Sequence, residues 1–347
     1  MAWVFLLVPT APPGTLVRMQ LPQPDDVLDA RARIHKHIRV TPVMQSDSLD
    51  ALTGMTLFWK CENLQRAGAF KFRGATNAVL QLDDATRARG VATHSSGNHG
   101  AALALAAQRA GLPATVVMPS NSVASKRAAV LTFGGRVVSC EPTAAARVAG
   151  LEQVVRETGA TPVHPFEHPH VVAGQGTATL ELLEQAEALH TILVPVGGGG
   201  LLGGTLLAVR AVGLPVHVIG CEPAGAADAE RSFRAGERLV DFVPDTVADG
   251  LRTPLGEVGF ALMMRDAADV VSVSERALLV AMRLIWERLK LVVEPSSAVP
   301  LAALLPGGPL HETLRGRRVG LVLSGGNVDL DALPVMPPLG FHDPVST

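Results

Sequence analysis

The chain has 347 residues, of which 18% are charged and 48% are hydrophobic, and its formal net charge is −2. This balance provides no basic field for nucleic acid and no acidic tail, so small-molecule partners are expected. The length suits one large domain or two linked domains with a substantial buried core, as in a globular enzyme.

The N-terminal segment, residues 1–18, contains a short apolar run from Trp3 to Val8. This run has no basic region before it and is followed by prolines, so it is not typical of a secretion signal. No stretch approaches the roughly 20 apolar residues of a membrane span. The three cysteines form no CxxC or Cys/His pattern. We therefore predict a cytoplasmic protein, in which residues 1–18 are either a flexible arm or lie upstream of a start at Met19.

From about residue 90 onward, β-rich runs alternate with alanine-rich helical stretches. In chain order these are GVATHSS, a helix from about Ala101 to Ala110, ATVVMPS, a helix around Ser125 to Phe133, GRVVSC, and then TILVPV, VHVIGCE, DVVSVS and RVGLVLS. Such alternation predicts a mostly parallel sheet with helices on both faces. We predict an α/β fold of two open twisted lobes, with the ligand site in the cleft where strands end.

A lysine, Lys71, lies between Phe70 and Phe72 in the stretch ENLQRAGAFKFRGA. Its ammonium could simply extend to solvent along an apolar stem. Alternatively, the lysine is held as a Schiff base, in which condensation with an aldehyde cofactor changes its charge. The second interpretation requires an aldehyde such as pyridoxal phosphate, and therefore a phosphate site elsewhere in the chain.

The stretch VPVGGGGLLGG supplies such a candidate, because Gly197 to Gly200 form a turn of bare backbone after a predicted strand. Glycines let consecutive N–H groups approach an anion, and the following helix adds a favourable dipole. However, Gly198, Gly200 and Gly203 also satisfy GxGxxG, and the acid Glu222 ends the next apolar run. The pattern therefore allows pyridoxal phosphate, a nicotinamide dinucleotide, or a purely structural turn.

Two further polar turns follow predicted strands. The first, THSSGNHG from Thr93 to Gly100, has more polar groups than a helix cap needs. It would suit a loop that grips a carboxylate, with Asn98 donating to a ring oxygen. In the second, LVLSGGNVD, Ser324 is either an ordinary turn residue or a partner for a heteroaromatic nitrogen in the cleft.

Together these stretches resemble the fold-type II pyridoxal-phosphate enzymes, the group of threonine and serine dehydratases and serine racemase. The matching segments are ENLQRAGAFKFRGA, SSGNHG, AGQGT, VPVGGGG, EPAGAAD, ADGLRT, EPSSA and SGGNVD, in the family's order. The resemblance implies a tryptophan synthase β-like fold. In that fold, residues 1–80 and 168–347 would form the large cofactor-binding domain and residues 81–167 a small mobile domain.

The resemblance also implies residue roles. Lys71 would form the Schiff base, Asn98 would meet the pyridine 3-oxygen, and Ser324 would meet the pyridine nitrogen. Ser96 would face the substrate on the side opposite the lysine, where it can exchange a proton. The phosphate would be held by Gly197, Gly198, Gly199 and Gly200. Further cofactor contacts would be Phe70, Gly250, Glu294 and Gly325. The substrate contacts would be Ser95, Ser96, Gly97, Asn98, His99 and Arg147.

A metal site is the next implication. EPAGAAD resembles the loop with which racemase-like members bind a divalent ion, here Mg²⁺ or Ca²⁺ held by Glu222, the Ala226 carbonyl and Asp228. The alternative is a surface loop that carries two acids. Since relatives are usually dimers or tetramers, a homodimer or homotetramer is expected.

The implied reaction is elimination of water from a β-hydroxy-α-amino acid of the serine or threonine type, giving a 2-oxo acid and ammonia. Serine racemisation is the main alternative. Arg147 could pair with the second carboxylate of 3-hydroxyaspartate, or it could be a solvated helix arginine. Ala67 and Ala69, which replace residues of the family's TGSFK, would also admit the phenyl group of phenylserine. A nicotinamide-dependent oxidoreductase and a non-catalytic binding protein are the alternatives of a different class.

Overall fold

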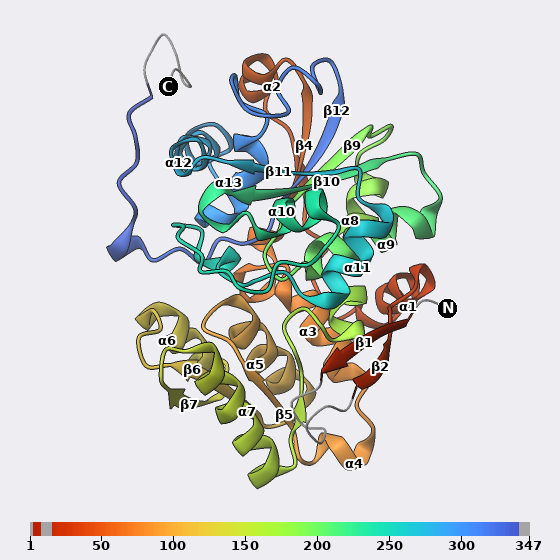
Figure 1. The fold of residues 1–347 in the computed structure, drawn as a ribbon, viewed down its shortest axis with the longest axis vertical. Helices are drawn as coiled ribbons and strands as arrows, with labels where there is room; N and C mark the ends of the chain where they lie inside the picture. Colours follow the sequence, from red (N-terminus) through yellow and green to blue (C-terminus); the bar gives the residue numbers. More distant parts are fainter. Residues whose placement is uncertain (1–2, 8–15, 340–347) are drawn as a thin grey trace.

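The computed structural model describes residues 3–7 and 16–339 (Figure 1). The larger of its sheets has six strands in the order β11-β10-β9-β12-β4-β3, all parallel except for the antiparallel edge pair of β3 and β4. In chain order their bounds are β3 Val43–Met44, β4 Thr56–Cys61, β9 Thr191–Pro195, β10 His217–Pro223, β11 Asp269–Val273 and β12 Arg318–Leu323.

The smaller sheet has four parallel strands in the order β7-β6-β5-β8. Their bounds are β5 Val91–His94, β6 Ala114–Pro119, β7 Arg136–Cys140 and β8 Thr161–Pro162. Figure 1 shows this sheet with its helices at the bottom of the view and the larger sheet above it. The predicted α/β fold with mostly parallel strands is therefore confirmed, and each predicted β-rich run contains one of the observed strands.

Helices cover both faces of the larger sheet because its strands are apolar at successive positions. In β4, Leu57 and Trp59 face the core beneath α2, α12 and α13, whereas Phe58 faces the core beneath α1, α8, α9 and α11. This continuous burial is typical of a parallel sheet with two covered faces. The helix bounds are α1 Pro24–Ile34, α2 Asp47–Thr53, α8 Pro169–Gln185, α9 Gly200–Val212, α11 Glu257–Asp266, α12 Glu275–Leu284 and α13 Pro295–Ala302.

The remaining helices are associated with the smaller sheet, the connection between the sheets, and one loop. They are α3 Lys71–Leu80, α4 Asp84–Arg87, α5 Asn98–Ala110, α6 Ala124–Thr132, α7 Ala144–Thr158 and α10 Asp228–Ala235. Helix α3 packs on α5 and on α8, so it lies between the two sheets. At the α3–α8 contact a Cβ on Gly74 would lie 2.5 Å from the carbonyl oxygen of Val171, so only glycine permits this close approach.

At the N-terminus, β1 Trp3–Leu7 and β2 Leu16–Gln20 pair as antiparallel strands. The other parts of the predicted arm, residues 1–2 and 8–15, lie outside the described residues. None of the helices in the described part of the chain has the length and apolar character needed to span a bilayer.

Candidate active site

A cavity of about 200 Å³ lies where strands of both sheets end. The loops after β5, β9 and β12 contribute its walls, together with the start of α3 and one side of α7. This is the edge at which open parallel sheets place their ligands, as the sequence predicted. All the predicted cofactor and substrate residues line the cavity except Gly325.

Lys71 is the first residue of α3, and its side chain reaches the cavity wall. The ammonium donates a hydrogen bond from Nζ to the carbonyl oxygen of Pro165 over 3.1 Å and lies 5.0 Å from the ring centroid of Phe70. Burial lowers the pKa of Lys71 to about 8, although the nearby carboxyl of Glu294 acts in the opposite direction. Phe72, in contrast, is buried in the core beside α5 and does not line the cavity, so it shapes the lysine's surroundings only through the helix.

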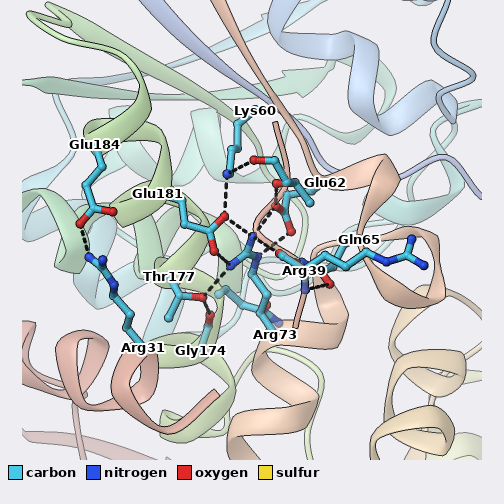
Figure 2. Close-up of polar contacts among 12 residues, drawn as sticks. Arg31, Arg39, Lys60, Glu62, Gln65, Arg73, Gly174, Thr177, Glu181 and Glu184 are labelled. Carbon is cyan, nitrogen blue, oxygen red and sulfur yellow. Dashed lines mark hydrogen bonds and ion pairs between the residues drawn. The ribbon is translucent and has the colours of Figure 1, made fainter. Parts of the chain in front are cut away.

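The start of α3 is held by a buried ion network around Arg73, the third residue of this helix (Figure 2). Arg73 donates to both oxygens of Glu62 at 2.7 Å each, and to both oxygens of Glu181 at 2.7 and 2.8 Å. Lys60 donates to Glu181 over 2.6 Å from its far side. Two cations therefore meet two carboxylates, and the buried charges compensate one another. This network fixes α3 against β4 and α8.

The glycine turn after β9 leaves a concave stretch of bare backbone. Gly199 has φ +84°, which side chains rarely adopt, and α9 begins at Gly200. A Cβ on Gly198 would lie 2.4 Å from the ring of Phe166, so no side chain fits there. The geometry suits an anion approached by backbone N–H groups, because glycine removes the steric barrier and the helix N-terminus adds partial positive charge.

Two of the predicted ring-binding residues are held by neighbours. Asn98 donates from Nδ2 to Oε1 of Glu294 over 2.7 Å, and its Oδ1 accepts from Asn327 over 3.0 Å. The hydroxyls of Ser324 and Ser297 are 3.1 Å apart. Burial raises the pKa of Glu294 to about 7, and its Oε2 has no hydrogen-bond partner among the described residues. A buried carboxyl oxygen without a partner fits a site that receives a polar ligand.

Gly325 does not reach the cavity, yet it anchors the wall. Its N–H donates to the Ser297 hydroxyl over 2.8 Å, and its backbone forms a bridge with Ala69, two residues before Lys71. Next to it, the N–H of Phe70 donates to the carbonyl of Ser324 over 3.0 Å. The lysine segment and the β12 segment are thereby tied directly together, so they form one side of the cavity.

The predicted substrate residues form the wall on the side of the smaller sheet. Ser96 is exposed, whereas His99 is buried and its Nε2 lies 3.1 Å from the carbonyl oxygen of Val163. Arg147 projects from α7, and no described acid forms an ion pair with it. Its charge lowers the pKa of His94 through repulsion, in addition to the larger effect of burial.

Several cavity-lining residues were not predicted from the sequence. Phe166 lies in a loop that the sequence did not single out. Asp249 and Thr253 belong to the matching segment ADGLRT, and Ser296 belongs to EPSSA, but none of the three was assigned a role. His94 had a signal, because it ends β5 directly after the buried Thr93 and so alternates toward the other face of the strand. The predicted polar turn, Thr93 to Gly100, already includes His94 but gave it no role.

The predicted metal residues lie outside the cavity. Both oxygens of Glu222 accept backbone N–H groups at the start of α10, at 3.2 Å from Ala229 and 2.8 Å from Glu230. Burial and the neighbouring Asp228 raise the pKa of Glu222, and Asp228 is itself buried with one oxygen, Oδ1, unpartnered. Among the described residues no group of three or more His, Cys, Asp or Glu side chains is arranged to hold a metal. The predicted ligands are two carboxylates and one backbone carbonyl, so they contain fewer than three such side chains and are not a group of this kind.

Comparison with known proteins identifies the family. Residues 34–325 match the family model described as pyridoxal-phosphate dependent enzyme. The chain is 47% identical over 316 residues to beta-hydroxyaspartate dehydratase of Paracoccus denitrificans, covering 91% of this chain and 99% of that protein. It is 41% identical to serine racemase of Dictyostelium discoideum, covering 89% of this chain and 95% of the relative. The structure of maize serine racemase superimposes with a TM-score of 0.87 at 41% identity, covering 90% of this chain and 95% of the maize chain.

These matches extend over most of both partners and include the lysine segment and the glycine turn. The GxGxxG pattern is thus part of a pyridoxal-phosphate enzyme, and the nicotinamide alternative that the sequence left open is set aside. The chain belongs to the fold-type II pyridoxal-phosphate-dependent enzymes, in the group that includes hydroxy-amino-acid dehydratases and serine racemases.

Proposed function

We propose that the protein is a dehydratase that removes water from a β-hydroxy-α-amino acid and releases a 2-oxo acid and ammonia. The observation that carries this proposal is the placement of the Lys71 amine in a cavity that also contains the bare glycine turn and the hydroxyl-rich loop after β5. Pyridoxal phosphate, when bound, supplies an electron sink for negative charge at the substrate Cα. The glycine turn fits its phosphate, and the unpartnered Glu294 oxygen fits a polar ligand beside Asn98.

In this proposal Lys71 holds the cofactor in the resting enzyme and takes the substrate's α-proton when its amine is free. Its lowered pKa, about 8, leaves a larger neutral fraction near pH 7 than an ordinary lysine has. The electrons of the Cα–H bond expel the β-hydroxyl, which gains a proton and leaves as water. The released enamine is then hydrolysed by water to the 2-oxo acid and ammonia.

Gly197 to Gly200 are proposed to bind the cofactor phosphate, and Asn98 and Ser324 the two polar positions of its ring. Phe70, Gly250 and Glu294 would complete the cofactor pocket, with Gly325 supporting Ser324 from behind. Ser95, Ser96, Gly97, Asn98 and His99 are proposed to bind the substrate carboxylate. Because Ser96 exposes its hydroxyl in the same cavity, racemisation through proton exchange at Ser96 is the second candidate reaction.

Among hydroxy amino acids, 3-hydroxyaspartate is the proposed preferred substrate. Arg147 lines the cavity without a described acidic partner, and a guanidinium in that position gains most from a second carboxylate. The relative from Paracoccus carries a name that states the same substrate class. This order differs from the serine or threonine preference that was expected from the sequence.

The test is a substrate panel. The purified protein is assayed for 2-oxo acid release from serine, threonine, 3-hydroxyaspartate and phenylserine, with chiral analysis of the remaining amino acid. We expect release from 3-hydroxyaspartate to be fastest, and Lys71→Ala to lose the yellow borohydride-sensitive cofactor linkage and nearly all turnover. The exposed Lys36→Ala serves as a matched control and should behave as wild type. Turnover by Lys71→Ala at the wild-type rate would reject the assigned role.

A divalent cation, Mg²⁺ or Ca²⁺, is also proposed, held by Glu222, Asp228 and the Ala226 carbonyl. The support is a buried, unpartnered oxygen on Asp228 beside a second buried carboxylate. Oxygen ligands of this kind are those that both cations prefer.

Residues 81–167 are proposed to move as a small lobe relative to residues 1–80 and 168–347. The smaller sheet lies wholly within that segment, and the Lys126–Asp249 ion pair connects it to the other lobe. The test is amide hydrogen exchange with and without substrate. Slower exchange across all of residues 81–167 on substrate binding would support this division, whereas slower exchange in single loops only would oppose it. A homodimer or homotetramer is proposed on family grounds, to be measured by light scattering.

A further inference from the structure

His94 lines the cavity, yet the proposed reaction gives it no task. It is the last residue of β5, and its ring makes no hydrogen bond to a described residue. Its ring nitrogens are not among the fully buried polar atoms that lack a partner, so in this half-buried residue they remain partly accessible. An imidazole held at a cavity wall with its polar atoms free is available to a ligand.

Neighbouring rings in the cavity wall restrict the orientation of the His94 ring. Its centroid lies 5.4 Å from that of His164 with the planes at 82°, and His164 packs edge-on against Phe166 at 4.6 Å. Nδ1 of His164 accepts the N–H of Glu167 over 3.2 Å, so the proton of this neutral ring is on Nε2. Edge-to-face contacts of this kind restrict ring rotation. His94 therefore presents a preset edge to the cavity.

The charges around His94 favour an anion. Burial and the positive charge of Arg147 lower the pKa of His94 to about 4, so the ring is neutral at pH 7 and donates one N–H. The acids that line the cavity, Asp249 and Glu294, are engaged with Lys126 and Asn98 respectively. In the described part of the chain, neither Arg147 nor His94 forms an ion pair with an acid.

We propose that His94 and Arg147 together bind the second carboxylate of the substrate, and that His94 makes the site selective for hydroxy dicarboxylic amino acids. The inference rests on the proposed function, which it deepens by assigning a specificity residue. His94 would donate its N–H to one carboxylate oxygen while the guanidinium binds the other. Serine would leave both groups without a carboxylate partner, which disfavours it.

Turnover provides the first test. The ratio of kcat/KM for 3-hydroxyaspartate to that for serine is measured in wild type, His94→Leu and His94→Gln. We expect His94→Leu to lower this ratio at least about tenfold, the value of one hydrogen bond to a charged group. His94→Gln retains an N–H donor and should restore part of the ratio. His170→Leu, an exposed histidine outside the cavity, is the matched control and should keep the wild-type ratio.

Binding provides a test that needs no turnover. The cofactor-loaded protein is titrated by calorimetry with succinate and with butyrate, which match in length and differ by one carboxylate. Wild type should prefer succinate, and both His94→Leu and Arg147→Met should lose at least about tenfold of that preference. An undiminished preference in folded His94→Leu and His94→Gln would overturn the inference.

The two proposals fail in different ways. If no amino acid is turned over but His94→Leu still loses the succinate preference, the dehydratase proposal falls and the dicarboxylate site stands. If 3-hydroxyaspartate is turned over and the substitution leaves both the substrate ratio and the succinate preference unchanged, the dehydratase stands and the role of His94 falls. Near-ultraviolet circular dichroism identifies any variant that has not folded, and in that case the measurements on His94→Gln decide.

Discussion

At the scale of single residues, Glu294 combines two properties that rarely coexist in a protein interior. It is 2% exposed, and one of its oxygens has no partner among the described residues while the other accepts from Asn98. Burial raises its pKa to about 7 from an unfolded value near 4.5. The folded state therefore binds this proton more tightly than the unfolded state, so ionisation of Glu294 destabilises the fold as pH rises through this interval.

We expect Glu294→Gln to remove this pH dependence from the cofactor-free protein, because an amide oxygen can still accept from Asn98 without ionising. The free energy of unfolding in urea is measured for both proteins at about pH 5 and about pH 8. The advantage of the variant over wild type should grow by roughly 2 to 3 kcal/mol between them, which is most of the equivalent of the pKa difference. An advantage that is the same at both pH values would show that Glu294 does not titrate in this range.

Residues were predictable where a contiguous motif carries them. Lys71 and the four glycines of the turn lie in short stretches whose composition is unusual, so their chemistry could be proposed before the fold was known. Phe166 was missed because lining a cavity depends on which way a loop faces. That direction is set by packing partners elsewhere in the chain, and a local pattern does not contain it.

At the scale of elements, helix α3 is positioned by contacts that no helical periodicity reveals. Arg73 follows the lysine by two positions, and its partners Glu62 and Glu181 are 11 and 108 positions away in the sequence. In the sequence, Arg73 is a charged residue between Phe72 and Gly74, and no local pattern indicates its ion-pair partners. Its complete burial makes sense because each carboxylate receives two hydrogen bonds from the guanidinium (Figure 2).

We expect Arg73→Met to leave the buried carboxylate of Glu62 without a cation and Glu181 with Lys60 alone, and to lower the free energy of unfolding by about 3 to 5 kcal/mol. Since Arg73 also fixes the start of α3, the variant should trap less pyridoxal phosphate on Lys71 by borohydride reduction. Lys60→Met is the matched control, because Lys60 joins the same network without contacting α3. Equal trapping in the two variants at equal stability would show that the network is structural only.

For the molecule as a whole, the sequence predicted two α/β lobes with mostly parallel strands, but it did not predict the order of the strands in the sheets. The alternation of β-rich runs and helices indicated parallel sheets with helices on both faces. However, β12 lies between β9 and β4 and so joins strands from distant parts of the chain. Such an order is fixed by tertiary packing. The short strand β4 was not among the predicted runs, although it contributes Trp59 to the core.

The proposed cation site connects local charge to the stability of the whole molecule. Glu222 is the next-to-last residue of β10, Asp228 begins α10, and Asp228 also accepts the N–H of Leu255 over 2.6 Å. The loop thus joins the sheet to the segment before α11. Two buried carboxylates that are both ionised repel each other, and a divalent cation between them would offset that repulsion. A ligand that binds only the folded state stabilises all of it through mass action.

We expect chelation of divalent cations to lower the melting temperature by a few degrees, and Mg²⁺ or Ca²⁺ at about 100 times its Kd to restore about 3 kcal/mol. Asp228→Asn removes one ligand and one of the two repelling charges, so its melting temperature should respond to neither treatment. Glu237→Gln, an exposed acid on the turn after α10, should keep the wild-type response. Were Asp228→Asn to gain stability from Mg²⁺ or Ca²⁺ as wild type does, the cation would have to bind elsewhere, and the loop would be held by its backbone hydrogen bonds alone.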